Sequence, residues 1–376
     1  MRLCRYSTPI AYNLSPLTYQ VTISHNSNSM GIGYSNVQCY LTRHSNYMKG
    51  LVIKSIGTSY GVYFEDGTTA DCHVKGNFRI RGIRSTNPVA IGDYVEVITN
   101  EDGTNWITEL YDRKNYIIRR ATNLSYASHI LAANVDMAAL IVTINHPKTS
   151  TTFIDRFLAT CEAYRVPACL IFNKIDLLNE EELQELASLR QLYESLDYPT
   201  YAISALRLQE SELTKLFQNR ITLLSGNSGV GKSTLLNAIL GKDIARTGAI
   251  SSAHHKGMHT TTFSEMYPIE GSGVQEERGS GVQEFRGSEG SGGSGSWIID
   301  TPGIKGFGLL DVEKEEIGHY FRDIFHFSHD CRYSNCLHTG EPGCAVYQAV
   351  AEGEIALSRY ESYLSILDDT QESKYR

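Results

Sequence analysis

The chain has 376 residues, of which 41% are hydrophobic, and a formal net charge of −8. Its length predicts two or three domains, because one hydrophobic core rarely grows this large, and no apolar run approaches the roughly eighteen residues that cross a membrane. The negative net charge excludes a positive potential over the whole surface that would attract nucleic acid, so any contact with RNA must be local. The basic cluster in residues 73–84 is one candidate for such a contact. A solvated strand face explains the same cluster as well.

Residues 1–47 differ from the rest of the chain. They contain no Asp or Glu and are rich in Ser, Asn and Tyr, without a sustained hydrophobic period. We expect this leader to be disordered or not native, with Met48 as the true initiator. An organelle transit peptide is the alternative.

Residues 48–117 contain short β-type segments separated by turns. Asp-Gly pairs at 66–67 and 102–103, and Gly-Asp at 92–93, punctuate the strands. Their spacing predicts a small barrel of the OB type, a scaffold often used on RNA. A barrel that serves only as a structural or docking module fits the same composition.

Residues 118–308 alternate predicted strands and helices, which indicates a mostly parallel sheet covered on both faces. Inside this domain, residues 270–296 hold two imperfect octads and a Gly/Ser tail. We expect a flexible insertion in the loop of a hairpin.

Two segments after predicted strands carry a guanine-reading pattern. Asn173, Lys174 and Asp176 form Asn-Lys-x-Asp, in which the carboxylate can accept both N1–H and N2–H₂ of guanine. Ser204 and Ala205 follow the next strand, and their backbone can donate to guanine O6. An ATPase with a coincidental Asn-Lys-x-Asp is the competing interpretation.

A complete phosphate-binding loop lies only later in the chain. It reads GNSGVGKS from Gly226 to Ser233, after a predicted strand and before a helix. Backbone N–H groups wrap the phosphates in such loops, while Lys232 reaches the terminal phosphates and Ser233 holds Mg²⁺. The predicted nucleotide-binding residues of this segment are Gly226, Asn227, Ser228, Gly229, Val230, Gly231, Lys232, Ser233 and Thr234.

Two predicted switch segments follow. The strand ending in Asp300 leads to Gly303, so the carboxylate can reach Mg²⁺ through water and the Gly303 N–H can meet the γ-phosphate. In the first switch we favour Thr261 over Thr260 and Thr262 as the Mg²⁺ ligand. Since base-reading segments precede the phosphate loop, the order is a circular permutation of the usual GTPase arrangement.

The residue after the second-switch glycine is apolar, so the hydrolytic residue must come from another segment. Ile304 stands where a water-positioning Gln often occurs, so hydrolysis should be slow without another polar group. His259 in the first switch is the candidate, beside Lys232 as the phosphate-contacting catalytic residue; an ordinary exposed loop histidine is an equal alternative.

The C-terminal residues 309–376 contain a metal-binding pattern. Three of the eight cysteines lie close together, and the spacing Cys-x4-Cys-x-His-x5-Cys predicts one closed, structural Zn²⁺ site. His329 is an alternative ligand, and the helices after the site should pack against it. The predicted ligands are Cys331, Cys336, His338 and Cys344.

From residue 48 to about residue 363, the chain resembles the RsgA/YjeQ family of circularly permuted GTPases of small-ribosomal-subunit biogenesis. The resemblance is carried by GDYVEV, AANVD, FNKIDL, SAL, SGNSGVGKSTLLN, GMHTTT, DTPGIKGFGL and the Cys-x4-Cys-x-His-x5-Cys pattern. It implies that the barrel and the zinc domain grip 16S rRNA on a maturing 30S particle, which stimulates GTP hydrolysis and release. It also implies a role for His259 in hydrolysis. The leader and the octad insertion depart from the family pattern without removing a motif residue.

We therefore expect a multidomain, monomeric cytoplasmic GTPase, or an organellar one if the leader is a transit peptide. Its fold class is an OB-type β-barrel, an α/β circularly permuted P-loop domain and a small, mainly helical zinc domain. GTP with Mg²⁺ and the 30S subunit are its expected partners, without a membrane. A nucleotide-gated scaffold with weak intrinsic hydrolysis and a protein partner is the alternative.

Overall fold

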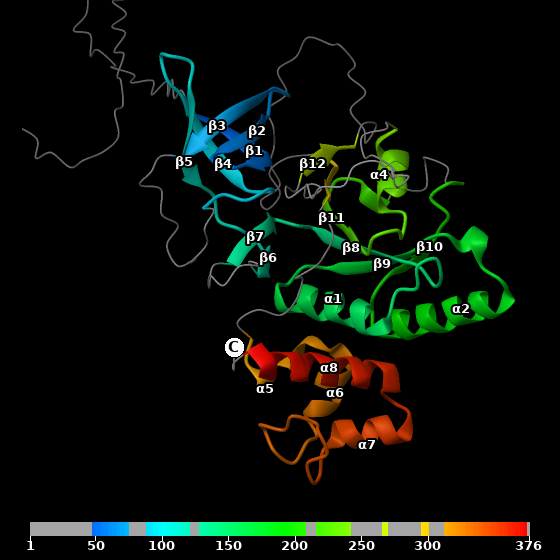
Figure 1. Cartoon of the computed structure of the whole chain (residues 1–376). Helices are drawn as coiled ribbons and strands as arrows, with labels where there is room; N and C mark the ends of the chain where they lie inside the picture. Colours follow the sequence, from blue (N-terminus) through cyan, green and yellow to red (C-terminus); the bar gives the residue numbers. More distant parts are fainter. Residues whose placement is uncertain are drawn as a thin grey trace, which may run out of the picture.

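The computed structural model describes residues 47–74, 88–120, 128–207, 216–241, 265–269, 295–300 and 312–373 (Figure 1). Within these ranges no helix combines the length and the apolar character needed to span a bilayer.

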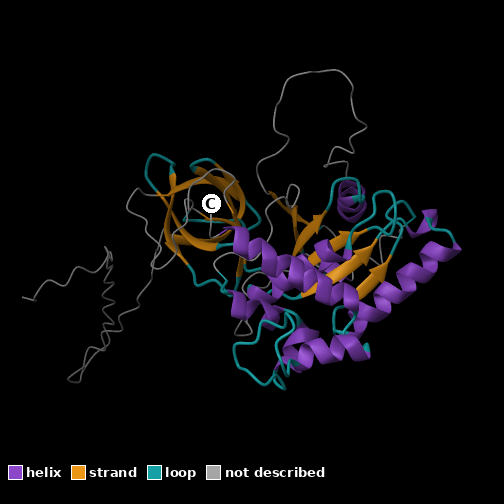
Figure 2. Cartoon of the chain, turned by 60° about the horizontal axis from the view of Figure 1, so that its bottom comes forward, coloured by secondary structure: helices purple, strands orange, loops and turns teal. Residues whose placement is uncertain are grey.

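Five strands close into a barrel, seen as a ring in Figure 2. Partly buried and fully buried positions alternate along β2 and through most of β4, so one face of each strand fills the barrel with Val62, Val95 and Val97. The predicted Asp-Gly turns are present, and the side chains of Asp66 and Asp102 each accept a backbone N–H two residues later at 2.9 Å. The strands run in the order β1-β2-β3-β5-β4, with β4 returning to β1: β1 (Tyr47–Ile56), β2 (Ser59–Phe64), β3 (Thr69–Val74), β4 (Tyr94–Thr99) and β5 (Asn105–Leu110).

The central domain is a mostly parallel sheet, as the alternating pattern predicts. Every residue of β8, β9 and β11 is buried because helices cover both faces. In Figure 1, α1 (Thr151–Ala163) and α2 (Glu180–Ser195) lie on one side of the sheet and α4 (Lys232–Leu240) on the other. The strand order is β10-β9-β8-β11-β13-β12: β8 (Met137–Val142), β9 (Ala168–Phe172), β10 (Thr200–Ala202), β11 (Ile221–Gly226), β12 (Glu265–Pro268, antiparallel) and β13 (Trp297–Asp300).

The barrel joins this sheet directly. Strand β1 pairs with β12 at Lys54 and Glu265, whose side chains form an ion pair of 3.0 Å. Beside it, the ring of Trp297 in β13 meets that of Tyr63 in β2 edge-on, with 4.9 Å between centroids. A separate hairpin of β6 (Tyr116–Arg120) and β7 (Ser128–Ala133) connects the two domains along the chain.

Of the expected insertion, the structure describes only residues 295–296. Ser296 is buried, and its side chain accepts the backbone N–H of Asn219 at 2.8 Å. Its carbonyl accepts the N–H of Ile269 at 2.9 Å, so ordered packing begins before β13.

The C-terminal helices pack on α1 (Figure 1). A buried ionic cluster lies at this contact. Arg359 is 1% exposed and donates to Asp155 of α1 at 2.6 Å and twice to Asp323 at 2.9 and 3.0 Å. Tyr193 of α2 donates to the same Asp155 oxygen at 3.0 Å. The elements are α5 (Lys314–Ile317), the 3-10 turn η2 (Gly318–Tyr320), α6 (Arg322–Ser328), α7 (Ala345–Glu352) and α8 (Leu357–Ser373).

Candidate nucleotide site and metal centre

The phosphate-binding loop runs from the end of β11 to the first turn of α4. Gly231 precedes α4 with φ of 94°, a conformation that favours glycine. A Cβ at this position would lie 2.4 Å from Nδ2 of Asn173, so a larger residue would displace that side chain. The predicted residues 226–234 are all described and form this loop and helix start.

Asn173 connects the three predicted parts of the nucleotide site. It is 3% exposed at the carboxyl end of β9, and its Nδ2 donates to the carbonyl of Val230 in the phosphate loop at 2.9 Å. Its Oδ1 accepts the N–H of Ala205 at 2.9 Å. One amide therefore holds the guanine-reading segments and the phosphate loop together, although they are separated along the chain. The same bond competes with the expected contact between the Ala205 N–H and guanine O6.

Lys174 and Asp176 follow Asn173 at the surface. Lys174 has φ of 63°, and its Nζ donates to the carbonyls of Gly229 and His146, both at 2.6 Å. Asp176 lies in the 3-10 turn η1 (Ile175–Leu177). The Ser204 hydroxyl, then its own backbone N–H and the charges of Arg207 and Lys174, lower the pKa of the Asp176 carboxyl group. The carboxylate is therefore ionised at neutral pH, the form that accepts two guanine N–H groups.

Strand β13 brings Asp300 to the start of α4. Its carboxylate forms an ion pair with the ammonium of Lys232, and both side chains are largely shielded from solvent. Ser233 follows Lys232 in the first turn of that helix. A carboxylate and a hydroxyl at this edge are the oxygen ligands that Mg²⁺ prefers, so these residues fit the expected cation.

Several predicted residues lie outside the described ranges: His259, the threonines 260–262, Gly303 and Ile304. The basic positions of residues 75–84 also lie outside them.

Residues 143–150, between β8 and α1, also reach the nucleotide site, although they belong to none of the predicted motifs. This loop contributes the His146 carbonyl to Lys174. A usable signal existed, because the carboxyl ends of neighbouring parallel strands meet at one edge and β8 lies between β9 and β11. A contact made by a backbone carbonyl, however, cannot be predicted from the residue types.

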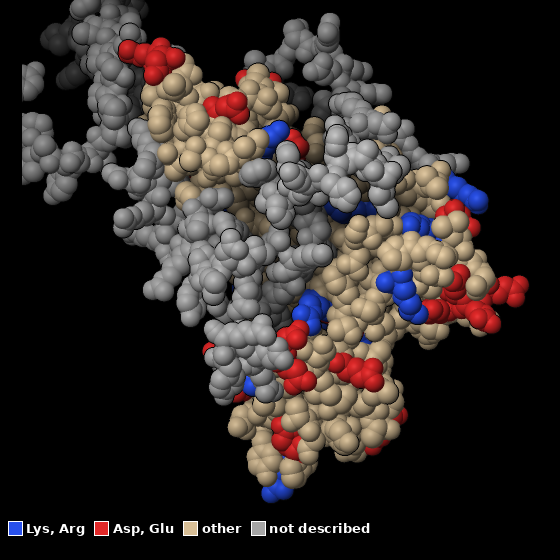
Figure 3. Space-filling view, viewed as in Figure 1, with Lys and Arg blue, Asp and Glu red and all other residues tan. Residues whose placement is uncertain are grey.

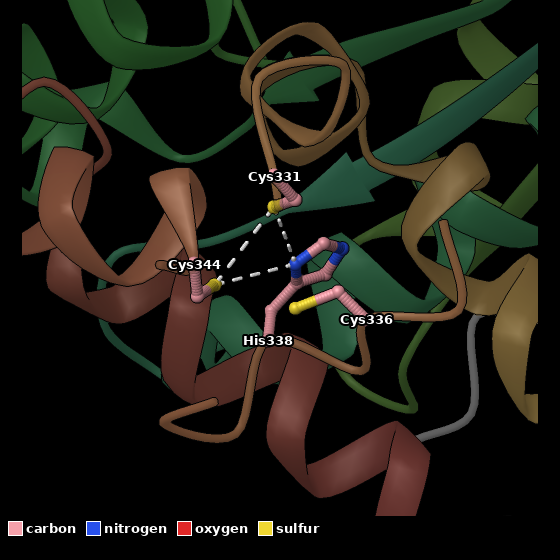
Figure 4. A group of neighbouring side chains, drawn as sticks. All are labelled: Cys331, Cys336, His338 and Cys344. Carbon is pink, nitrogen blue, oxygen red and sulfur yellow. Dashed lines mark hydrogen bonds between the residues drawn. The ribbon is translucent and has the colours of Figure 1, made fainter. Parts of the chain in front are cut away.

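The four predicted zinc ligands converge (Figure 4), with all ligand atoms within 4.8 Å of one another. Nδ1 of His338 lies 3.5 Å from the sulfurs of Cys331 and Cys344, which are 4.0 Å apart. Ligands of a tetrahedral zinc ion, at about 2.3 Å for sulfur and about 2.0 Å for nitrogen, are separated by about 3.5 to 3.8 Å. The four side chains thus fit a zinc ion. The alternative ligand His329 instead packs its ring against Phe325 at 4.8 Å.

Helix α8 supports this cluster, as expected. The hydroxyl groups of Tyr360 and Tyr363 donate to the carbonyls of His338 and Leu337 at 2.6 and 2.7 Å. Glu341 accepts the N–H groups of Leu337 and Thr339. These bonds hold the ligand-bearing turn in place.

Comparison with known proteins identifies the chain's family. The RsgA N-terminal domain model matches residues 49–107, and the RsgA GTPase model matches residues 110–285. The small ribosomal subunit biogenesis GTPase RsgA of Phocaeicola vulgatus is 56% identical over 330 residues, which cover 88% of this chain and 99% of the relative. This chain belongs to the RsgA family of GTPases. The protein of the same name from Porphyromonas gingivalis is 51% identical over 332 residues, 88% of this chain and 99% of the relative.

Solved structures agree with the family. YjeQ from Thermotoga maritima matches with a TM-score of 0.63 and 30% identity over 86% of this chain and 98% of its own. YloQ, described as a circularly permuted GTPase, matches with a TM-score of 0.62 and 26% identity over 89% of this chain and 99% of its own. The predicted family, the fold class and a GTP-hydrolysing activity are thereby confirmed.

Proposed function

We propose that this GTPase assists maturation of the small ribosomal subunit, binding the particle in its GTP state and leaving after hydrolysis. The observation that carries the guanine site is the position of Asn173, which bonds to both the phosphate loop and the Ser204-Ala205 segment. The relatives' printed name supplies the ribosomal partner. The second candidate function is a nucleotide-gated scaffold with a protein partner. In that case the small subunit would not stimulate GTP hydrolysis.

In the proposed GTP site, Asp176 reads the guanine edge and the loop 226–234 wraps the phosphates. Ser233 and Asp300, with Thr261, hold Mg²⁺, which neutralises phosphate charge when bound. Lys232 exchanges its Asp300 partner for the terminal phosphates. Gly303 contacts the γ-phosphate, and His259 takes part in hydrolysis.

In the proposed zinc site, Cys331, Cys336, His338 and Cys344 hold one structural ion. The convergence of three thiols and one imidazole, with no open position, supports a structural role. The ion then fixes the turn that Tyr360 and Tyr363 support.

The barrel (48–117) and the zinc domain (309–376) bind 16S rRNA on either side of the GTPase domain (118–308), and residues 1–47 take no part. The protein works as a monomer in the cytoplasm, without a membrane.

Steady-state hydrolysis tests the proposal. GTP and ATP are each supplied to the purified protein, with and without 30S subunits. We expect turnover of GTP alone, strongly stimulated by 30S. Tight GTP binding without stimulation would contradict the ribosomal role, and equal use of ATP would contradict the guanine site.

A further inference from the structure

The loop between β8 and α1 is closed on itself by hydrogen bonds. Thr143 is fully buried; its N–H donates to the Thr149 hydroxyl at 3.2 Å and its hydroxyl to the Pro147 carbonyl at 2.5 Å. The Thr149 N–H returns to the Thr143 carbonyl at 2.9 Å. The ends of the loop are therefore fixed, and its tip, around His146, faces the phosphate loop through Lys174.

The contact at this tip joins two residues in an uncommon backbone conformation. His146 and Lys174 have φ of 57° and 63°. A non-glycine residue is disfavoured in the left-handed region because its Cβ crowds the backbone, so its surroundings must hold it there. The Lys174 ammonium bridges the His146 carbonyl to the Gly229 carbonyl. The position of His146 thus influences both Lys174 and the phosphate loop.

Asn145 attaches this tip to α2. Its Oδ1 accepts the His146 N–H at 2.9 Å, and its Nδ2 donates to Oε1 of Glu182 at 2.6 Å. Glu182 is itself fixed, because its Oε2 accepts the Asn179 N–H at 3.0 Å while its own N–H donates to the Asn179 side chain at 2.9 Å. This capping box begins α2, directly after the guanine-reading segment.

We propose that Asn145 and Glu182 are positioning residues for the nucleotide site, holding the His146 carbonyl where it anchors Lys174 against the phosphate loop. This inference rests on the proposed GTP site and adds to it. Neither side chain is placed against the nucleotide. Each acts by keeping the site in its binding geometry, so that less ordering accompanies association.

The charges around Glu182 favour this arrangement. The Asn179 N–H, then the Asn145 amide, then the charges of His146 and Lys148 lower the pKa of Glu182, so it is a carboxylate at neutral pH. Acidic side chains gather at this end of α2 (Figure 3), and Glu185 in the next turn pairs with Lys148 at 2.8 Å.

Nucleotide binding to the full chain tests the proposal. Dissociation constants for GDP and GTP are measured by competition with a fluorescent guanine nucleotide for the wild type, Asn145→Ala and Lys148→Ala. Lys148 is the matched control, since it lies in the same loop and contacts α2 through an exposed pair. We expect Asn145→Ala to raise both constants about tenfold and Lys148→Ala to leave them within about twofold.

Two further readouts separate positioning from loss of fold. Asn145→Ala should raise KM for GTP while kcat at saturation and the preference for GTP over ATP stay unchanged, because Asp176 still reads the base. Its melting temperature should match that of Lys148→Ala. Constants within twofold of the control, or a loss of affinity that follows a lower melting temperature, would overturn the proposal. A wild-type chain without guanine-nucleotide affinity would instead overturn the GTP site itself.

A second variant covers the case in which Asn145→Ala does not fold. Asn145→Asp places a carboxylate beside Glu182, with His146, Lys148 and Glu185 as the neighbouring charged groups. Two carboxylates repel when both are ionised and can share a proton at lower pH. As the pH rises from 5 to 8, the GDP affinity of Asn145→Asp should therefore fall relative to that of the wild type. Affinities of the two proteins that change with pH in parallel would overturn the proposal.

Discussion

The GTPase domain holds its two neighbours in different ways. On the barrel side the sheet continues from β12 into β1, with the Tyr63–Trp297 ring contact and an exposed Lys54–Glu265 pair. On the C-terminal side, Arg359 is buried between Asp155 and Asp323. Helix α8, which carries Arg359, lies on the side of α1 that faces away from the sheet (Figure 1). The contact with the barrel, here called the barrel joint, is formed by strands β12 and β13 of the sheet that carries the nucleotide site. The contact with the C-terminal domain, the C-terminal joint, is formed by a buried ionic cluster.

The difference matters for signalling. β13 ends at Asp300, which contacts Lys232, and the same strand carries Trp297, which contacts Tyr63 of the barrel. α1 carries no predicted nucleotide ligand, and its buried cluster fixes the zinc domain to the GTPase core. We therefore expect the barrel joint to respond to nucleotide and the C-terminal joint to supply stability.

Removal of zinc should have the largest effect. Cys344→Ser, or a chelator, removes a ligand set whose binding free energy is on the order of 10 kcal/mol in small zinc domains. We expect loss of bound zinc and rapid proteolysis after residue 312, measured by metal analysis and limited digestion. Cys72→Ser, which changes a buried barrel thiol, should keep the zinc. A zinc-free wild type with an ordered C-terminal domain would contradict the site.

The buried cluster should come next. Arg359→Met leaves the carboxylates of Asp155 and Asp323 buried without their cation, which costs about 3–5 kcal/mol of unfolding free energy. Urea unfolding measures this loss. The matched control is Arg156→Met, which removes an exposed pair with Asp369 at the same helix contact and should cost at most about 1 kcal/mol. Equal losses would show that the C-terminal joint does not depend on the cluster.

The aromatic contact at the barrel joint should contribute less to stability. Tyr63→Leu removes an edge-on ring pair worth about 1 kcal/mol. It should also reduce the difference in 30S affinity between the GTP and GDP states, measured by co-sedimentation. Trp106→Leu removes a ring contact with His73 on the outer face of the barrel and should leave that difference unchanged. Equal effects of the two substitutions would mean that the Tyr63–Trp297 contact does not link the nucleotide state to the barrel.

The exposed ion pair at the same joint should matter least. Lys54 and Glu265 are 45% and 41% exposed, so Lys54→Ala should change the unfolding free energy by less than about 1 kcal/mol. Urea unfolding at low and high salt checks this. A loss above about 2 kcal/mol would mean that the pair, and not strand pairing, holds the barrel.

Sequence patterns predicted the parts of the fold that depend on local periodicity. The buried runs of β8, β9 and β11 and the glycine-rich loop indicated a parallel sheet with its functional residues at one edge. The spacing of Cys331 to Cys344 predicted the cluster that the structure assembles.

Contacts between distant segments were not predictable in the same way. Arg359 and Asp155 are 204 positions apart, and nothing near either residue indicates its partner. The pairing of β1 with β12 joins two domains, and the His146 carbonyl acts through the backbone. These contacts depend on the assembled fold and not on a local residue pattern.

We propose that guanine recognition by Asp176 controls binding to the small subunit. Co-sedimentation with 30S subunits tests it most directly, using wild type and Asp176→Asn with non-hydrolysable analogues of GTP or xanthosine triphosphate. We predict that the wild type binds with the GTP analogue and the variant only with the xanthosine analogue. Binding that does not depend on the nucleotide, or that the substitution leaves unchanged, would contradict the account.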